Sequence, residues 1–573
     1  MKNQGRKGNL TRFVVWAALN VVLLIGCGGG GGGPGPVSGP MPMPVPPDSL
    51  SPTVVSTDPA DAAIDVAVDA SLRITFSEPM DSATVNGANF KVRAGGTEMA
   101  GTVCCAHNTI TFTPATNWGF ATTYTVTISG GASGVKNLAG NPLSAGASWT
   151  FTTSGMPAPA TVISSGTDSA SGAQLAMDAS GTAIAVWVQG NGIWSNRYVP
   201  GTGWGVATPI SSGTGGAEAP QVTMGGSGTA TAVWHQWDGA QNSIYANRYV
   251  LGTGWGTATI IKTGAGQAQV AMDASGNAIA VWPQSLGAIW NIYANRYILG
   301  TGWGMETLIQ TTSGDAYLPQ VAMDNNGDAI AVWAQYDAQS SIYANRYVPG
   351  TGWGTATYFD TGSSWDYVPQ VAVADSGAAM VVWTGHTGTV LDNSFRVYLC
   401  ANRYIPGSGW ETPSVIWSKS SLVVVSPQVV MDVDGKAVVV WNETASAGGS
   451  YGAVTVSEIK ASSYVPGTGW TEPVFIDAPL PWSQAGSPRV AMGRNGNAVA
   501  VWYQSAFGGF TGQIYANRYV AGTGWGTANV VETSAENTSS PRVATDGNGN
   551  FIIMWQQWDG TRNNISAVRY QVP

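Results

Sequence analysis

One phrase recurs eight times along the chain and constrains its fold more than any other feature. It is a short apolar run that ends in tryptophan, at Trp187, Trp234, Trp282, Trp333, Trp383, Trp441, Trp502 and Trp555. The first seven are followed by a segment such as IYANRY and then by a turn such as PGTGWG. The spacing of 47 to 61 residues is typical of repeats that pack into one array. Repeats specify a scaffold, so any function must come from what differs between them.

Each repeat predicts four antiparallel strands. In the repeat that starts at Gln269 these are QVAMD, AIAVW, IYANRY and a last strand around TLIQ, separated by a D-x-x-G turn, a variable loop and the GTGWG turn. Four strands per repeat around a ring make a β-propeller blade. The eighth repeat ends at AVRYQVP without a fourth strand, whereas the array opens at Thr161–Ser165, which matches the fourth strand Thr208–Ser212. We therefore predict that residues 155–573 form an eight-bladed propeller closed by its N-terminal strand.

Composition excludes some classes of function. Charged residues are only 10% of the chain, against about 25% in ordinary domains. The formal charge is −9 and no cluster of Lys and Arg exists, which argues against nucleic acid as a partner. Cys400 replaces the Tyr found at Tyr245 or Tyr343 and is expected to be buried, and the adjacent Cys104 and Cys105 do not indicate a disulfide framework.

The first residues predict export. A basic stretch, Lys2 to Arg12, precedes an apolar run, Phe13 to Ile25, that is too short for a convincing membrane-spanning helix. The run ends in Leu24-Ile25-Gly26-Cys27, which resembles the bacterial lipobox. The resemblance implies removal of residues 1–26 and acylation of Cys27, which would attach the protein to a membrane. An ordinary signal peptide and an N-terminal anchor helix are the alternatives.

Residues 27–50 are rich in Gly and Pro and are expected to act as a tether. The chain would thus be lipid-anchored in the cell envelope. In lipoproteins of this type an Asp after the Cys marks inner-membrane retention. The residue after Cys27 is Gly28, which favours the outer membrane or the cell surface.

Residues 51–154 predict a separate all-β module. Five segments alternate and are β-branched: SLRITFSEPMD (71–81), NTITFTPATNW (108–118), TYTVTISGG (123–131), VKNLAGNPL (135–143) and WTFTTS (149–154). FSEPMD, FTP and the ending GN-x-L…W-x-FTT resemble the SbsA-type bacterial Ig-like domain. The resemblance implies a β-sandwich that serves as a spacer or adhesion module. The whole chain is therefore expected to be all-β.

The D-x-x-G turn recurs at Asp178, Asp273, Asp324, Asp432 and Asp546. It loosely resembles the Asp-box hairpins of sialidase-like propellers. Calcium binding at these turns is an open alternative, but the matching positions Gly225, Ala374 and Gly493 carry no carboxylate. An Asp that caps its own turn explains the pattern better, and we predict no metal site and no cofactor.

Strand order places all D-x-x-G and GTGWG turns on one face of the propeller. The loops between second and third strands and the links between repeats lie on the opposite face, called here the variable face. Variable loops on a rigid scaffold commonly carry binding sites. We expect ligand binding here.

The candidate ligand-binding residues on the variable face are aromatic and polar. They are the pairs Trp237–Asp238, Tyr336–Asp337, Trp558–Asp559 and Trp365–Asp366, together with Gln236, Gln335 and Gln557. Rings that stack on sugars, with amides and carboxylates for the hydroxyls, are what a glycan site needs. The alternative is that the rings fill gaps between blades and the Gln side chains satisfy backbone groups at strand ends.

Two repeats depart from the pattern. Repeat five has a long loop with His386, Asp392 and Arg396, and repeat six has Glu443 and Glu458 between Asn442 and Ile459. A single catalytic site requires residues that are not repeated eightfold, so these would be its first candidates. No Ser/His/Asp or metal cluster emerges, and no catalytic residue is assigned. The arginine that recurs from Arg197 to Arg569 is expected to pack on neighbouring aromatic rings.

The favoured function is a lipid-anchored, non-catalytic binding or adhesion protein, with a membrane contact through its lipid and with polysaccharide or a surface protein as partner. The alternatives are a propeller hydrolase that acts on glycans and a purely structural envelope scaffold.

Overall fold

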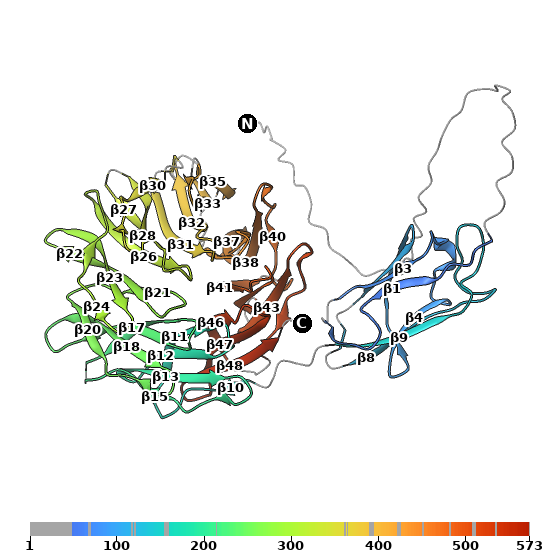
Figure 1. Cartoon of the computed structure of the whole chain (residues 1–573), viewed down its shortest axis with the longest axis horizontal. Helices are drawn as coiled ribbons and strands as arrows, with labels where there is room; N and C mark the ends of the chain where they lie inside the picture. Colours follow the sequence, from blue (N-terminus) through green and yellow to red (C-terminus); the bar gives the residue numbers. More distant parts are fainter. Residues whose placement is uncertain are drawn as a thin grey trace, which may run out of the picture. The chain divides into compact units, whose positions relative to one another are not determined.

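The protein is described by a computed structural model. It covers residues 49–573, except 67–69, 116–117, 120–121, 154–159, 214, 338, 360–361, 364, 389–394, 421–425, 450–451, 481–482, 507–510, 533–535 and 572–573. The predictions for Cys27, for the rest of residues 1–48 and for Asp392 lie outside the described residues. Within them, regular structure consists of strands and one 3-10 turn, η1 (Ser82–Thr84), so the all-β prediction is confirmed (Figure 1).

The N-terminal module is a pair of sheets. One has the order β1 (Val54–Asp58), β3 (Leu72–Phe76), β7 (Thr109–Pro114), β6 (Gly101–Ala106). The other has the order β2 (Ala63–Val66), β9 (Ala147–Thr153), β8 (Thr123–Ile128), β4 (Phe90–Ala94), β5 (Thr97–Glu98). Alternate residues of these strands, such as Ile74, Phe112, Val126 and Phe151, form one buried core with Trp118. This arrangement fits the predicted Ig-like module.

One predicted strand of this module is wrong. Residues 135–143 form turns with isolated bridges, Met80 to Asn137 and Lys136 to Pro142. The reason is local, because Gly140 adopts φ +87° and the Asn137 amide donates to the Asn141 carbonyl at 2.9 Å. Asn and Gly here specify a turn that the apolar spacing conceals.

The repeat domain consists of eight successive antiparallel units. Their first strands are β11 (Ala170–Met177), β16 (Ala217–Met224), β21 (Gln269–Met272), β26 (Asp315–Met323), β31 (Trp365–Val373), β36 (Gln428–Met431), β41 (Gln484–Met492) and β46 (Thr538–Thr545). The second strands are β12 (Ala183–Gln189), β17 (Ala230–Trp237), β22 (Ala278–Leu286), β27 (Ala329–Tyr336), β32 (Ala379–Thr387), β37 (Ala437–Gly449), β42 (Ala498–Ser505) and β47 (Asn550–Trp558). The third strands are β13 (Gly192–Val199), β18 (Asn242–Val250), β23 (Ile289–Ile298), β28 (Ser340–Val348), β33 (Arg396–Ile405), β38 (Gly452–Val465), β43 (Gln513–Val520) and β48 (Asn563–Gln571).

The predicted fourth strand is present as a short strand, and the GTGWG segment, predicted to be only a turn, contributes a further short strand. Both pair with the third strand. In repeat one these are β14 (Gly203–Trp204) and β15 (Thr208–Pro209), which pair with β13. The next six repeats have the same arrangement, with β19 (Gly254–Trp255), β20 (Thr259–Thr263), β24 (Gly302–Trp303), β25 (Thr307–Leu308), β29 (Gly352–Trp353), β30 (Thr357–Phe359), β34 (Gly409–Trp410), β35 (Ser414–Lys419), β39 (Gly469–Trp470), β40 (Val474–Phe475), β44 (Gly524–Trp525) and β45 (Asn529–Val530).

The sheets stand around a common centre with their first strands innermost, a propeller-like arrangement (Figure 1). Each first strand packs beside the first strand of the next repeat, and β46 packs beside β11. In the eighth repeat the outer position beside β48 is occupied by β10 (Thr161–Val162), with Thr161 opposite Ala567. The start and the end of the repeat domain thus share one sheet.

The core lies between neighbouring sheets. Alternate residues of each second strand face opposite neighbours, so Trp187 packs with Met554 of repeat eight whereas Val186 packs with Trp234 of repeat two. The repeated Trp residues are fully buried. Alternating Ala and Val beside each Trp leave room for the indole, which explains the recurrent AxAVW pattern.

The asparagine of the ANRY segment joins neighbouring repeats. Asn247 Nδ2 donates to the carbonyl of Ile210 in the preceding repeat at 2.9 Å and to Gly256 in its own turn at 3.0 Å. Asn196 makes the same pair of bonds, to Ile163 at 3.0 Å and to Gly205 at 3.1 Å. The segment after β10 thus has the same contact with repeat one as the outer strand of repeat one has with repeat two.

Three predictions about repeated side chains are confirmed. The guanidinium groups of five of the arginines, from Arg197 to Arg403, lie over tyrosine rings of the next repeat, as Arg248 does over Tyr297 at 4.1 Å. Asp324 Oδ1 accepts hydrogen bonds from the backbone amides of Asn326 and Asp328, both at 2.9 Å, and so caps its own turn. Cys400 is fully buried opposite Trp383.

Candidate functional site

The face that carries the D-x-x-G turns has a central cavity of about 300 Å³. Turn residues from all eight repeats line it, among them Asp178, Asp432 and Arg494. The charges there have local partners, since Arg494 lies 3.6 Å from Asp375. Across the described part of the chain, no three His, Cys, Asp or Glu residues gather closely enough to hold a metal ion. The residues that the sequence singles out for ligand binding lie on the variable face.

The three aromatic–Asp pairs expose their rings. Trp237 is 47% exposed, Tyr336 45% and Trp558 38%. The carboxylates, however, point into their own loops. Asp238 accepts hydrogen bonds from Ser243 Oγ at 2.5 Å and from the amides of Ala240 and Gln241, both at 2.9 Å. These bonds, the one from Ser243 first, lower the pKa of Asp238. Asp337 likewise accepts from the hydroxyl of Tyr343 at 2.7 Å, and burial raises the pKa of Tyr343 to about 12.

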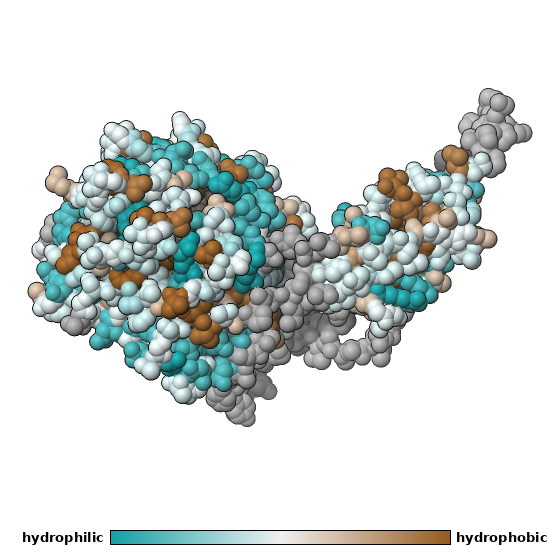
Figure 2. All heavy atoms as spheres, turned by 60° about the horizontal axis from the view of Figure 1, so that its bottom comes forward, coloured by the Kyte–Doolittle hydropathy of each residue, from teal (hydrophilic) through white to brown (hydrophobic). Residues whose placement is uncertain are grey.

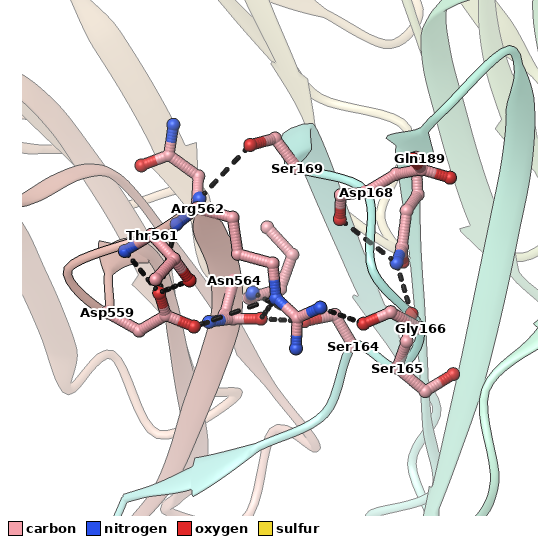
Figure 3. Close-up of polar contacts among 12 residues, drawn as sticks. Ser164, Ser165, Gly166, Asp168, Ser169, Gln189, Asp559, Thr561, Arg562 and Asn564 are labelled. Atoms are coloured by element: carbon pink, nitrogen blue, oxygen red, sulfur yellow. Dashed lines mark hydrogen bonds and ion pairs between the residues drawn. The ribbon is translucent and has the colours of Figure 1, made fainter.

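Figure 3 shows the same arrangement at Asp559. Its carboxylate accepts from Thr561 and Asn564, at 2.6 and 2.7 Å, and the bond from Thr561 is the largest cause of its lowered pKa. Arg562 bonds the carbonyl of Gly166, and the Asn563 amide donates to Ser169 Oγ at 3.2 Å (Figure 3). This loop of the last repeat is thus fastened to the first.

The recurrent glutamines connect the core to the links between repeats. Gln236 Oε1 accepts from the Trp234 indole at 2.8 Å, and its Nε2 donates to the Ser212 carbonyl at 2.6 Å. Gln335 bonds Trp333 at 3.0 Å and Thr312 Oγ1 at 2.8 Å. Gln557 accepts from Trp555 at 3.2 Å. Gln236 and Gln335 therefore connect a core indole, through Oε1, to the link between repeats, through Nε2. Gln557 bonds its core indole through Oε1.

Exposed rings from repeats four and five form a stacked row. Tyr336 stacks on Trp365 with centroids 5.5 Å apart and 15° between the planes. Trp365 stacks on His386 at 6.4 Å, and His386 contacts Phe395 at 5.2 Å. Burial lowers the pKa of His386. A second exposed pair, Trp290 with Tyr317 at 6.4 Å, joins repeats three and four.

Two other predicted residues of repeat five, Asp366 and Arg396, lie within or at the edge of its sheet. Asp366 is buried and accepts a hydrogen bond from Ser363 Oγ. Arg396 is exposed at the start of β33, where it pairs with Thr387 of β32.

Repeat six places several charges together. Glu443 is buried in β37 and forms ion pairs with Lys419 of β35 and with Lys460 of β38, the latter at 2.7 Å. The pKa of Glu443 is lowered: burial, the largest influence, raises it, and the two lysines more than offset that effect. Glu443 is therefore an ionised carboxylate fixed between two cations.

A second carboxylate, that of Asp477, has a raised pKa, whereas the pKa of Glu443 is lowered. Asp477 follows β40, just before the link to repeat seven, and Glu458 stands opposite Glu443 on β38. Burial, and then the charge of Glu458, raise the pKa of Asp477 to about 6. Gln504 Nε2 lies 3.5 Å from its carboxylate. Asp477 is half-buried and can therefore hold a proton up to about pH 6 while remaining accessible.

Sequence reasoning did not single out Asp477 or Trp290. The signal for Asp477 was its place after the outer strand, which is Ser164 or Ser211 in other repeats. There the Ser211 hydroxyl accepts from the amide of Ile193 at 2.9 Å, as the Ser164 hydroxyl does from Ile565 at 3.0 Å. Repeat seven also has an acid at the equivalent position, Glu532, so the residue type there varies between repeats.

Comparison with known proteins covers both parts of the chain. Residues 48–153 match the family of the bacterial Ig-like domain. Among curated proteins, none matches this sequence. The repeat region is similar to solved propeller-type structures at low identity, and this likeness concerns the fold.

Three of these structures are glycan-active enzymes. The polysaccharide lyase Uly1 has 10% identity and a TM-score of 0.44, over 66% of this chain and 94% of that chain. The α-L-arabinofuranosidase Arb93A from Fusarium graminearum has 13% identity and a TM-score of 0.31, over 54% and 93%. The Hadza microbial sialidase Hz136 has 10% identity and a TM-score of 0.30, over 58% and 74%.

These neighbours correct the favoured prediction from sequence. A non-catalytic binding or adhesion protein is contradicted by the enzymes among them, which agree better with the alternative of a glycan-active hydrolase. The carboxylates of the aromatic–Asp pairs, which suggested a lectin-like surface, are bonded to residues of the third strand of their own repeat. Among the helices of the described region, none is long and apolar enough to cross a membrane.

Proposed function

We propose that the repeat domain is a glycan-active hydrolase whose site lies on the variable face around repeats six and seven. Asp477 acts as the general acid and Glu458 as the second carboxylate. The observation that carries this proposal is the environment of Asp477, whose pKa is raised to about 6 by burial and by the neighbouring charge of Glu458. Environments that push two acids apart are typical of acid–base assignments in glycoside hydrolysis.

In this mechanism Asp477 donates its proton to the leaving glycosidic oxygen as the bond to the anomeric carbon breaks. A water molecule that gives its proton to the carboxylate of Glu458 attacks the same carbon from the opposite side. The two residues come from adjoining elements, since the amide of Ile476 donates to the carbonyl of Ile459 at 2.9 Å. That strand contact fixes the link beside β38. The ion pairs of Glu443 with its lysines hold the neighbouring strand β37 in place.

The pH dependence of activity tests the acid directly. Because Asp477 must carry its proton, we expect the rate to fall as the pH rises through about 6. Replacing Glu458 by Gln removes a negative charge, so the pKa of Asp477 should fall. Because Glu458 is itself assigned a catalytic role, the readout is an NMR titration of the Asp477 carboxyl group in the two proteins. An unchanged pKa of Asp477 in Glu458→Gln would contradict the coupling.

The stacked row of Tyr336, Trp365 and His386 supports a glycan as substrate. Flat exposed rings can stack on sugar faces, and we take the energy of such a contact as similar to that of an aromatic pair, about 0.5–1.5 kcal/mol. Trp365→Ala should therefore raise KM about 3- to 10-fold with little change in kcat. Tyr358 on β30 is also exposed, and Tyr358→Ala is the control, for which KM should stay the same. Equal effects of both variants would remove the row from the substrate site.

We further propose that the repeats form an eight-bladed propeller closed by β10. The pairing of Thr161 with Ala567 and of Val162 with Ser566, and the packing of β46 beside β11, support this count and this closure.

Attachment of the protein to the envelope through an acylated Cys27 also remains a proposal, supported by the Leu24-Ile25-Gly26-Cys27 motif. We expect a Cys27→Ser variant to lose incorporation of labelled palmitate and to leave the membrane fraction. Membrane association that survives this substitution would contradict lipid anchoring.

A further inference from the structure

One polar position recurs on the innermost strands. It holds Gln in six repeats and Arg in the last two, namely Gln174, Gln221, Gln269, Gln320, Gln370, Gln428, Arg489 and Arg542. All eight occupy the same register, because each stands opposite the residue that precedes the core Trp, as Gln174 does opposite Val186 and Arg542 opposite Met554. The two arginines are therefore exact replacements of Gln within one structural framework.

A β-bulge immediately precedes this position on the first strand. The pairing of first and second strands shifts just before it in six repeats. Two residues before it, non-glycine residues adopt positive φ: Ala219, Leu318, Val368, Ser487 and Ser540, with φ between 50° and 54°. A β-branched residue such as Val368 does so only at a cost. Bulges of this kind re-aim side chains and are enriched next to active sites.

The two arginines lie beside each other without a carboxylate partner. Arg489 Nη1 donates to the Pro488 carbonyl at 2.8 Å, and Arg542 Nη1 to the Pro541 carbonyl at 2.9 Å. Arg542 Nε also donates to Gln174 Oε1 at 3.0 Å, across the junction of the last repeat with the first. No Asp or Glu among the described residues lies within ion-pair distance of either guanidinium, and both side chains are half-buried.

Such a pair costs stability. Burial, and then the neighbouring charge of Arg489, lower the pKa of Arg542 to about 9, which means that its environment disfavours the cation. Burial also lowers the pKa of Arg489. Six repeats fold with neutral Gln at this position, so the scaffold does not need the charges. Unfavourable charges without a structural task are characteristic of binding sites.

We propose that Arg489 and Arg542 together bind one carboxylate or sulfate group of an acidic glycan. The planar guanidinium group matches such oxyanions with two parallel hydrogen bonds, and an anion between the two cations would remove their repulsion. The inference rests on the proposed function in that it specifies the substrate class of the same domain. The acids of the proposed catalytic site, Asp477 and Glu458, take no part in this anion site.

The test is glycan binding by the full chain with Arg489→Gln and Arg542→Gln combined. Gln is the residue of the other six repeats, so these changes suit the fold. The control is Arg494→Gln, which removes one positive charge from repeat seven at the D-x-x-G end, where Arg494 is exposed. Calorimetry with galacturonate oligosaccharides, sulfated galactan oligosaccharides and neutral galactan oligosaccharides separates the carboxylate, the sulfate and the uncharged sugar.

We expect the protein to bind one of the two acidic probes, and the double variant to bind it at least tenfold more weakly, with Arg494→Gln unchanged. Equal affinity of the double variant, or equal affinity of the protein for the neutral probe, would overturn the inference. Cleavage is measured separately with the same probes. Binding of an acidic probe without cleavage would contradict the hydrolase activity and support the anion site. Cleavage of neutral glycans alone would support the hydrolase activity and contradict the anion site.

Thermal unfolding supplies a second readout. Without ligand, the double variant should melt at the same or a higher temperature, because a repulsive pair has been removed. The acidic probe that binds should raise the melting temperature of the unmodified protein and leave that of the variant unchanged. A lower melting temperature of the ligand-free variant would show that the arginines are structural and would count against the site.

Discussion

Asp477→Asn should lower kcat for glycan hydrolysis about 10²- to 10⁴-fold, the usual contribution of a positioned general acid. The amide has the same shape and retains an oxygen for the backbone of Ile459, but it cannot donate the required proton to the glycosidic oxygen. KM should change little, because the stacked rings that bind sugar are not altered. Steady-state kinetics on the oligosaccharide that the protein cleaves gives both constants.

Glu532→Gln is the matched control. Glu532 is the equivalent acid after the outer strand of repeat seven, where the amide of Val531 donates to Ile514 at 2.8 Å, as Ile476 donates to Ile459 at 2.9 Å. A position that only caps the strand end would be equally sensitive in both repeats. If Glu532→Gln lowers kcat as much as Asp477→Asn does, the role of Asp477 is structural.

The same variant has a predicted effect on stability. The pKa of Asp477 rises from 3.8 to about 6 on folding, so its contribution to stability is full below about pH 4 and is lost as the pH rises through 6. Replacement by Asn removes this loss. With an allowance for partial exposure, we expect the variant to gain about 1–2 kcal/mol in free energy of unfolding at pH 7 and nothing at pH 4. Denaturant unfolding at the two pH values measures this.

Activity lost together with stability gained distinguishes a functional acid from a structural one. A variant that loses both activity and stability at pH 7 would contradict the assignment, because the raised pKa requires that the charged form of Asp477 destabilises the fold.

The repeat architecture was predictable because its signals are redundant. The Trp at the end of each second strand recurs in all eight repeats, the D-x-x-G turn and the ANRY segment recur in most of them, and each has an identifiable structural task. The indole fills the space between sheets, Asp324 and its equivalents cap a turn, and Asn247 and its equivalents bond the preceding repeat. Agreement between local pattern and global fold makes such predictions secure.

The candidate site was less predictable because the hydrogen bonds and neighbouring charges of its residues depend on contacts between segments that are apart in the sequence. Asp238 and Asp559 suggested a ligand surface, but the loop that follows each one supplies its hydrogen bonds. The character of Asp477 depends on Glu458, which is nineteen residues away and becomes a neighbour only through β38 and the following link. The substitution of Gln by Arg489 and Arg542 is visible in the sequence, but their adjacency requires that β41 and β46 pack side by side.

The closure of the ring has a sharp test in one pair of isoleucines. Ile163 follows β10 and is 3% exposed, and Ile210 follows β15 at the equivalent place of the first repeat and is 4% exposed. Each amide donates to the third strand of its sheet at 2.8 Å, Ile163 to Ile565 and Ile210 to Ile193. Each carbonyl accepts from the asparagine of the next repeat. If β10 completes the eighth blade, the two side chains fill equivalent positions in equivalent cores.

We therefore expect Ile163→Ala and Ile210→Ala to destabilise the repeat domain by similar amounts, about 2–5 kcal/mol each, which is the usual cost of removing these methyl groups from a core. Chemical denaturation of the two variants measures the difference. In an open array β10 would have no sheet to complete, so Ile163→Ala would cost less than about 0.5 kcal/mol, as surface substitutions do, while Ile210→Ala kept its full effect. Equal losses would mean that a strand from the start of the domain carries as much of the fold as one from its middle, which only a closed ring requires.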